Sequence, residues 1–155
     1  PDTVANAASL PLRPTGPGGA KELARVETQF SEGADRTLFQ SAFKRVFTPN
    51  RQQRDPVGST RDLRALANKY PNAAPIYRVM GYAAVDNGFQ TQLAFRMYNK
   101  AVELDPDYGE VHYALAFLYV MSDKATGAAH YKMALKLGVE DQRGIGQRFY
   151  PDLVQ

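Results

Sequence analysis

The sequence predicts an all-α protein built from helical hairpins that repeat along the chain. Four positions return 35 residues later, with Tyr77, Met80, Gly81 and Ala84 reappearing as His112, Leu115, Ala116 and Tyr119. A second set returns 33 residues later, with Ala94, Tyr98 and Ala101 reappearing as Gly127, Tyr131 and Ala134. The average period is therefore 34 residues. It is typical of a helix-turn-helix unit that must stack on copies of itself to bury its apolar face.

The composition of the chain limits which classes of protein it can belong to. The chain has 155 residues, of which 44% are hydrophobic and 23% charged, as expected for a soluble globular protein of about one domain. No apolar run reaches the length of a membrane-spanning helix. Cysteine is absent, which excludes disulfides and thiolate metal sites and fits oxidising and reducing compartments equally.

Residues 1–20 are predicted to form a flexible linker, because prolines and glycines interrupt any apolar period. The first residue is Pro1 rather than Met, so we expect upstream residues to have been removed. A signal peptide, a membrane anchor or a chosen boundary of the sequence would fit equally well. The tether favours a periplasmic or secreted bacterial protein, and a cytoplasmic one stays open.

A helical domain is predicted over residues 21–155. Leu23, Val26 and Phe30 form the apolar stripe of a first helix, and residues 35–47 form a second with three phenylalanines on one side. A third helix is expected over 60–70, after the capping pair Ser59 and Thr60. Residues 35–71 would then be a degenerate unit with an unusually long connection, which is often functional or disordered.

Two regular repeats follow, at residues 72–107 and 108–138. Small side chains at repeated positions allow close helix packing. These positions are Gly81, Ala94, Ala101, Ala116, Gly127 and Ala134. Residues 139–155 are expected to close the stack, with a short helix over 140–148 and with Phe149 and Tyr150 covering the last apolar face.

This pattern resembles the tetratricopeptide repeat (TPR) family over about residues 72–138. The second copy departs from the family pattern in carrying Val139 where the closing proline would be. The resemblance implies a short right-handed solenoid whose first helices line a concave groove. Carried over by position, the groove residues are Arg78, Tyr82, Val85, Asp86, Glu110, Tyr113, Phe117, Val120 and Met121.

The predicted groove is aromatic and aliphatic, which suits capture of a peptide or helix of another protein. The alternative is that several of these residues pack on a neighbouring helix. The resemblance argues against the family's carboxylate clamp for chaperone tails, because only Arg78 fits it. Tyr82 and Ala114 stand where that clamp needs asparagine.

Positive charge is concentrated between residues 44 and 69, which hold seven basic and two acidic residues. The predicted basic patch comprises Lys44, Arg45, Arg51, Arg54, Arg61 and Arg64. Such a segment is most simply a solvated surface, but it could attract an acidic protein, nucleic acid or an anionic membrane.

No catalytic motif is present: there is no Gly-x-Ser-x-Gly, phosphate-binding loop or His-Glu-x-x-His. His112 and His130 alone do not form a zinc site. We therefore expect no enzyme activity, no cofactor and no metal. The predicted function is a protein-interaction or assembly scaffold. A basic tether to nucleic acid or membrane is the alternative, and self-association is a variant because an incomplete solenoid exposes its ends.

Overall fold

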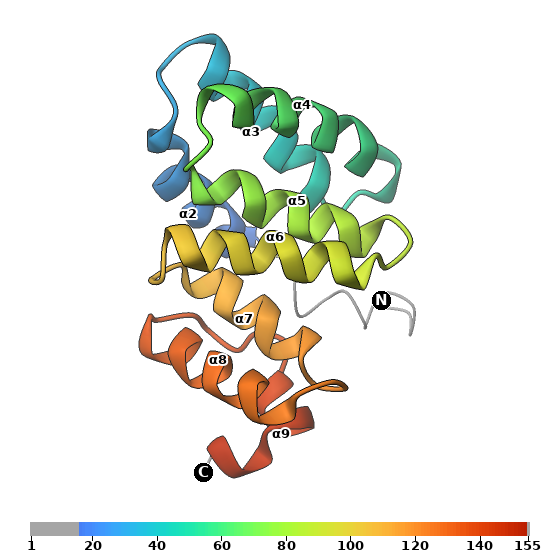
Figure 1. Ribbon diagram of the computed structural model, residues 1–155, viewed down its shortest axis with the longest axis vertical. Coiled ribbons are helices and arrows are strands. Elements are labelled where there is room, and N and C mark those ends of the chain that lie inside the picture. Colours follow the sequence, from blue (N-terminus) through green and yellow to red (C-terminus); the bar gives the residue numbers. More distant parts are fainter. Residues whose placement is uncertain (1–15, 155) are drawn as a thin grey trace. The chain divides into compact units, whose positions relative to one another are not determined.

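The computed structural model describes residues 16–154, with side chains from Gly19 onward. Within this range the regular elements are all helices (Figure 1), so the prediction of an all-α helical-repeat fold is confirmed. The described chain divides into two compact units between Leu104 and Asp105. We call residues 16–104 the N-terminal unit and residues 105–154 the C-terminal unit.

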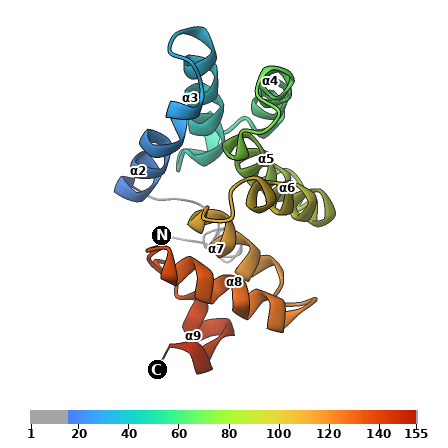
Figure 2. The same cartoon turned by 60° about the vertical axis from the view of Figure 1, so that its left-hand side comes forward.

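The N-terminal unit contains five α-helices joined by short connections. They are α2 (Gly16–Val26), α3 (Ala34–Phe47), α4 (Pro56–Lys69), α5 (Ala74–Asp86) and α6 (Thr91–Leu104), with 3-10 turns at Glu27–Gln29 and Arg51–Gln53. Each helix from α3 to α6 packs on the next, and α3 also contacts α5. In Figure 2, α2 lies beside α3, away from α4 and α6.

A chain of aromatic rings forms the core between α3 and its neighbours. Ring centroids lie 4.4 Å apart for Phe30 and Phe39, 6.1 Å for Phe39 and Phe43, and 4.7 Å for Phe43 and Phe47. The Phe47 ring lies 5.0 Å from that of Tyr82 on α5. The phenylalanine stripe of the sequence is therefore the contact between the degenerate unit and the next hairpin.

Two predicted boundaries at the start of this unit are wrong. Helix α2 begins at Gly16, so residues 16–20 of the predicted linker are helical; the rest of that linker lies outside the described residues. Helix α4 begins at Pro56, four residues before Thr60. Its N-cap is Asp55, whose carboxylate accepts a hydrogen bond from the Gly58 amide at 2.9 Å, and a proline at the first turn suits a helix start.

Helices α5 and α6 form a tightly packed hairpin. A methyl group on Gly81 would lie 2.5 Å from the Tyr98 ring, so only glycine allows this approach without a shift. Ala94 and Ala101 are fully buried on the same side of α6. The connection turns through Gly88 and Phe89, both with positive φ (80° and 52°), and Phe89 is half exposed there.

The C-terminal unit is one hairpin and a closing segment. It contains α7 (Gly109–Leu118), α8 (Lys124–Lys136), the short α9 (Ile145–Phe149) and a 3-10 turn at Pro151–Leu153. Helix α7 packs on α8. Asp123 caps α8 by accepting a hydrogen bond from the Thr126 amide at 3.1 Å, and the hydrogen bonds from Thr126 lower the pKa of Asp123.

The closing segment covers the hairpin through Tyr150, which is buried and donates a hydrogen bond from its hydroxyl to the Ala116 carbonyl at 2.6 Å. A methyl group on Gly127 would collide with that hydroxyl. Phe149 meets the Phe117 ring edge to face, with centroids 6.0 Å apart. Helix α9 is shorter than the predicted 140–148, because Gly144, with φ of 65°, precedes its first residue.

Candidate protein-interaction surface

The first helices of the N-terminal unit, α3 and α5, share a face on which α2 lies. Helix α2 contacts α3, and its Glu22 reaches Arg78 on α5. The Arg78 guanidinium donates two hydrogen bonds to the Glu22 carboxylate, from Nε at 3.0 Å and from an Nη at 3.1 Å. Both side chains are almost fully buried, since Glu22 is 0% and Arg78 is 2% exposed. The pair is therefore a bidentate ion pair shielded from water.

Aromatic side chains surround this ion pair. The Arg78 guanidinium lies over the Phe47 ring, 4.8 Å from its centroid, a cation–π contact. Tyr82 and Tyr98 are fully buried nearby. Burial raises the pKa of Tyr98, and the positive charge of Arg78 partly opposes that shift. A guanidinium in such surroundings requires an anion, because an uncompensated buried charge is strongly destabilising.

The structure corrects the predicted groove in this unit. Arg78, Tyr82 and Val85 were expected to face a partner, but all three are buried, at 2%, 0% and 3% exposed. All three lie on α5, the first helix of its hairpin, and Glu22 of α2 engages Arg78 there. Asp86, at the end of α5, is half-buried.

In the C-terminal unit a single carboxylate connects the hairpin to its closing segment. Asp141 accepts hydrogen bonds from the hydroxyls of Tyr113 on α7 at 2.7 Å and Tyr131 on α8 at 2.9 Å. It also accepts from the Ile145 and Gly146 amides, each at 2.9 Å, at the start of α9. These four donors lower the pKa of Asp141 against the opposing effect of burial. Burial and the Asp141 charge together raise the pKa of Tyr131 to about 12.

This arrangement changes the interpretation of the predicted groove residues on and after α7. Tyr113 is only 7% exposed, and its hydroxyl donates a hydrogen bond to Asp141. The expectation that Tyr113 is open to a partner was therefore wrong. Phe117 and Val120 are half-buried and pack against a core cluster that includes Tyr113, Tyr131 and Tyr150. Glu110 is half-buried, and Met121, in the turn after α7, is 94% exposed.

The two histidines lie together between α7 and α8. Their Nδ1 atoms are 2.9 Å apart, and His112 Nε2 lies 2.7 Å from the Pro106 carbonyl oxygen, to which it donates. His112 Nδ1 is then the acceptor for a proton on His130. Burial, with a smaller effect of His112, lowers the pKa of His130 to about 4. Within residues 16–154 no group of three or more His, Cys, Asp or Glu side chains is placed to hold a metal ion.

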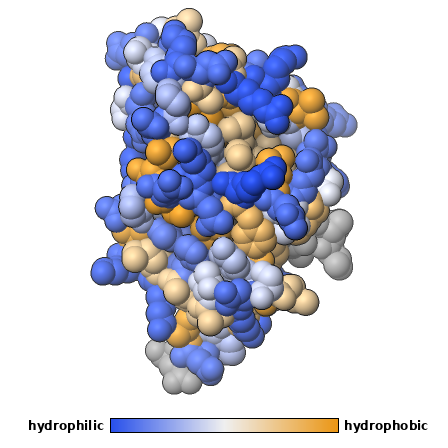
Figure 3. All heavy atoms as spheres, viewed as in Figure 1, coloured by the Kyte–Doolittle hydropathy of each residue, from blue (hydrophilic) through white to orange (hydrophobic). Residues whose placement is uncertain are grey.

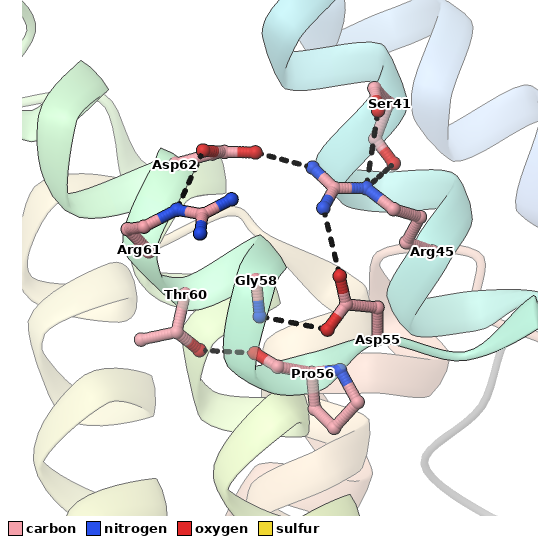
Figure 4. Close-up of polar contacts among 8 residues, drawn as sticks. All are labelled: Ser41, Arg45, Asp55, Pro56, Gly58, Thr60, Arg61 and Asp62. Atoms are coloured by element: carbon pink, nitrogen blue, oxygen red, sulfur yellow. Dashed lines mark hydrogen bonds and ion pairs between the residues drawn. The ribbon is translucent and has the colours of Figure 1, made fainter.

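Arg45 of the predicted basic patch forms ion pairs with an acidic residue of α4 and with the N-cap of that helix (Figure 4). Its guanidinium contacts Asp62 at 2.6 Å and Asp55 at 3.2 Å. The hydrogen bond from Arg45 is the main reason that the pKa of Asp62 is lowered. Arg45 therefore fixes the 48–55 connection between α3 and α4, and much of its charge is neutralised locally.

Other arginines of the patch are also used within the unit. Arg54 donates from Nε to the Thr48 carbonyl at 2.9 Å, and Arg61 lies 3.4 Å from Asp62. Lys44, Arg51 and Arg64 are exposed. Hydrophilic side chains cover most of the surface over α3 and α4 on the face that Figure 3 shows. The patch is thus a solvated surface with internal ion pairs.

Sequence reasoning missed Glu22 and Asp141, the two carboxylates on which these arrangements depend. Glu22 lies four residues before Val26 on the apolar stripe of α2, which places it on the buried side. Asp141 precedes Gly144 and the start of α9, as a capping residue does. Those spacings were the available signals, but they do not identify the distant partners.

Comparison with known families gives a match between residues 97–135 and the family described as tetratricopeptide repeat. The matched segment runs from within α6 to near the end of α8. Comparison with curated proteins and with solved structures gives no match. In the part of the chain that the structure describes, no helix has the length and apolar character needed to span a bilayer.

Proposed function

We propose that this chain, which carries a tetratricopeptide repeat, is a protein-interaction scaffold that binds a segment of a partner protein on its first-helix face. Repeats of this family generally mediate protein–protein interaction or assembly, and they are generally scaffolds rather than enzymes. The observation that carries the proposal is the family match over helices whose repeated small positions pack closely.

In the C-terminal unit the proposed contact residues are the accessible ones on and after α7. Met121 is exposed, and Phe117 and Val120 present part of their surface next to it in sequence. An exposed, adaptable methionine close in sequence to an aromatic side chain suits an apolar segment of a partner. Tyr113 supports this surface indirectly through Asp141.

A basic tether to nucleic acid or membrane has less support. Arg45, Arg54 and Arg61 all bind groups of their own unit. Phosphate contacts require basic side chains that can release counterions on binding. Self-association remains a variant of the scaffold proposal.

Site-specific photo-crosslinking tests the proposal. A benzophenone side chain is placed at Met121 in the intact chain, and a matched variant carries it at Met133 on α8, which is also accessible at 36% exposed. We expect one protein of the native extract to be cross-linked from position 121 and not from position 133, at low and at high salt. Equal cross-linking from both positions, or recovery of nucleic acid alone, would contradict the proposal.

A further inference from the structure

Helix α2 occupies its face of the N-terminal unit through few buried contacts. Among its side chains from Gly19 onward only Glu22 and Val26 are buried, whereas α5 buries eleven residues. Its sequence, GPGGAKELARV, contains three glycines, which disfavour helix relative to alanine. Elements with few apolar contacts open locally at much lower free energy than the core. Helix α2 also contacts α3 much less extensively than α3 contacts α4 or α5 contacts α6. Among the α-helices of this unit it is therefore the one that we expect to be released most easily.

The segment after α2 would remain attached if α2 were released. Phe30 is 1% exposed, stacks on Phe39 and meets Tyr70 edge to face. Arg36 donates two hydrogen bonds to the Phe30 carbonyl, at 3.1 and 3.0 Å. The 3-10 turn Glu27–Gln29 lies between this anchor and α2 and buries no residue. That turn is where the chain can pivot.

The surface under α2 has a defined chemistry. The Arg78 guanidinium lies over the Phe47 ring, which packs on Tyr82. Its Nε and one Nη both donate hydrogen bonds to the Glu22 carboxylate. A neutral or basic occupant would not replace the Glu22 carboxylate, and removing one partner of a buried ion pair is strongly disfavoured. The occupant therefore needs a carboxylate, and α2 shows that a helix presenting an apolar residue one turn later fits.

We infer that the α3–α5 face is a docking site for an amphipathic helix of a partner protein bearing a glutamate and, four residues later, a β-branched apolar residue. Helix α2 fills this site in cis, and the partner helix displaces it. The inference rests on the proposed scaffold function and adds its regulation. A tethered α2 competes at high effective concentration, so the apparent affinity for the partner falls by the fraction of chains whose face is open.

Peptide binding to the full chain tests this inference. The probe is a fluorescein-labelled peptide of residues 16–29, and its binding is followed by anisotropy. We expect the Glu22→Gln chain, with a weakened α2, to bind the probe at least tenfold tighter than the wild-type chain does. The same chain should bind a Glu22→Gln probe at least tenfold more weakly. A Glu27→Gln chain is the matched control, because Glu27 pairs with Gln40 at 2.8 Å instead, and it should behave as wild type.

Equal binding to the wild-type and Glu22→Gln chains, or equal binding of the two probes, would overturn the inference. Hydrogen exchange on the wild-type chain covers the case in which the variant does not fold. There, excess probe should accelerate exchange of the α2 amides and leave α5 unchanged, and no acceleration would overturn the inference. A stable wild-type dimer in light scattering would also overturn it, in favour of a second copy. Position-dependent cross-linking from Met121 despite such a result would leave the scaffold proposal standing.

Discussion

Each unit uses one carboxylate to hold a terminal segment against its helical hairpins, but the two carboxylates are satisfied differently. Glu22 meets a charged partner, Arg78, in a bidentate ion pair. Asp141 is satisfied by four neutral donors, two from hairpin tyrosines and two from the backbone of its own segment. A single ion pair can be exchanged for another, whereas four converging hydrogen bonds cannot be reproduced by an incoming side chain. The first arrangement suits a replaceable element and the second a permanent one.

The largest effect is expected for Asp141→Ala. Four donors would lose their acceptor at once, and hydrogen bonds to a charged group contribute about 1.5–3 kcal/mol each without being additive. We expect the free energy of unfolding to fall by about 3–4 kcal/mol. Urea denaturation measures it. The control is Asp152→Ala, at an exposed position, where a change above about 0.5 kcal/mol would be unexpected.

A smaller and local effect is expected for Glu22→Gln. Breaking a buried ion pair costs about 3–5 kcal/mol when the remaining charge stays buried. Here α2 can detach and let water reach Arg78, so we expect a loss of about 2 kcal/mol, confined to the α2 amides in hydrogen exchange. Loss of protection throughout α3–α6 would show that α2 is as permanent as the closing segment, and the contrast between the units would disappear.

Removing one hydroxyl should weaken the closing segment without releasing it. Tyr150→Phe leaves the buried Ala116 carbonyl without this donor, and we expect a loss of about 1 kcal/mol in thermal or urea unfolding. Tyr77→Phe is the matched control, because the Tyr77 hydroxyl bonds the Pro71 carbonyl at an exposed position. If the free energy of unfolding fell equally in both variants, burial of the Tyr150 hydrogen bond would not add to its contribution to stability.

The smallest effect concerns pH. Since the pKa of His130 is about 4 in the folded chain and 6.5 ordinarily, the unfolded chain binds the proton more readily. His130 therefore stabilises the fold fully above pH 6.5, and this contribution is lost as pH falls toward about 4. The ring is half-buried, so solvent limits the effect to about 1 kcal/mol. Urea midpoints between these pH values measure it, and a His130→Gln variant that kept the same slope would exclude this histidine as the cause.

The fold was readable from the sequence because it depends on local spacing. The repeated positions at Gly81, Ala94 and Ala101 are buried contacts, and the phenylalanine stripe of residues 35–47 is the core of α3. The start of α4 was misplaced although Pro56 is a typical first residue of a helix. The capping pair Ser59 and Thr60 predicted a later start, whereas Asp55 is the residue that caps the helix.

The candidate site was less predictable, because it depends on distant partners. Arg78 and Glu22 are 56 residues apart in the chain, and no spacing rule connects them. The glycines and prolines before Lys21 favoured a linker, but the tertiary contact of Glu22 outweighs that local preference. Tyr113 was assigned to a partner for the same reason: its hydrogen-bond acceptor, Asp141, lies in the closing segment.

Gly127 has a consequence for how this chain could change in length. Its missing side chain makes room for the Tyr150 hydroxyl, which then meets the Ala116 carbonyl. An added hairpin after α8 would take the place of the closing segment, and position 127 would then return to the alanine that the preceding repeat carries at Ala94. Without Tyr150, Tyr119 Cβ would still lie 3.1 Å from a methyl group at position 127, so alanine would fit there only after a small shift. Gly127 and the closing segment are therefore matched to each other, and a change in one would call for a change in the other.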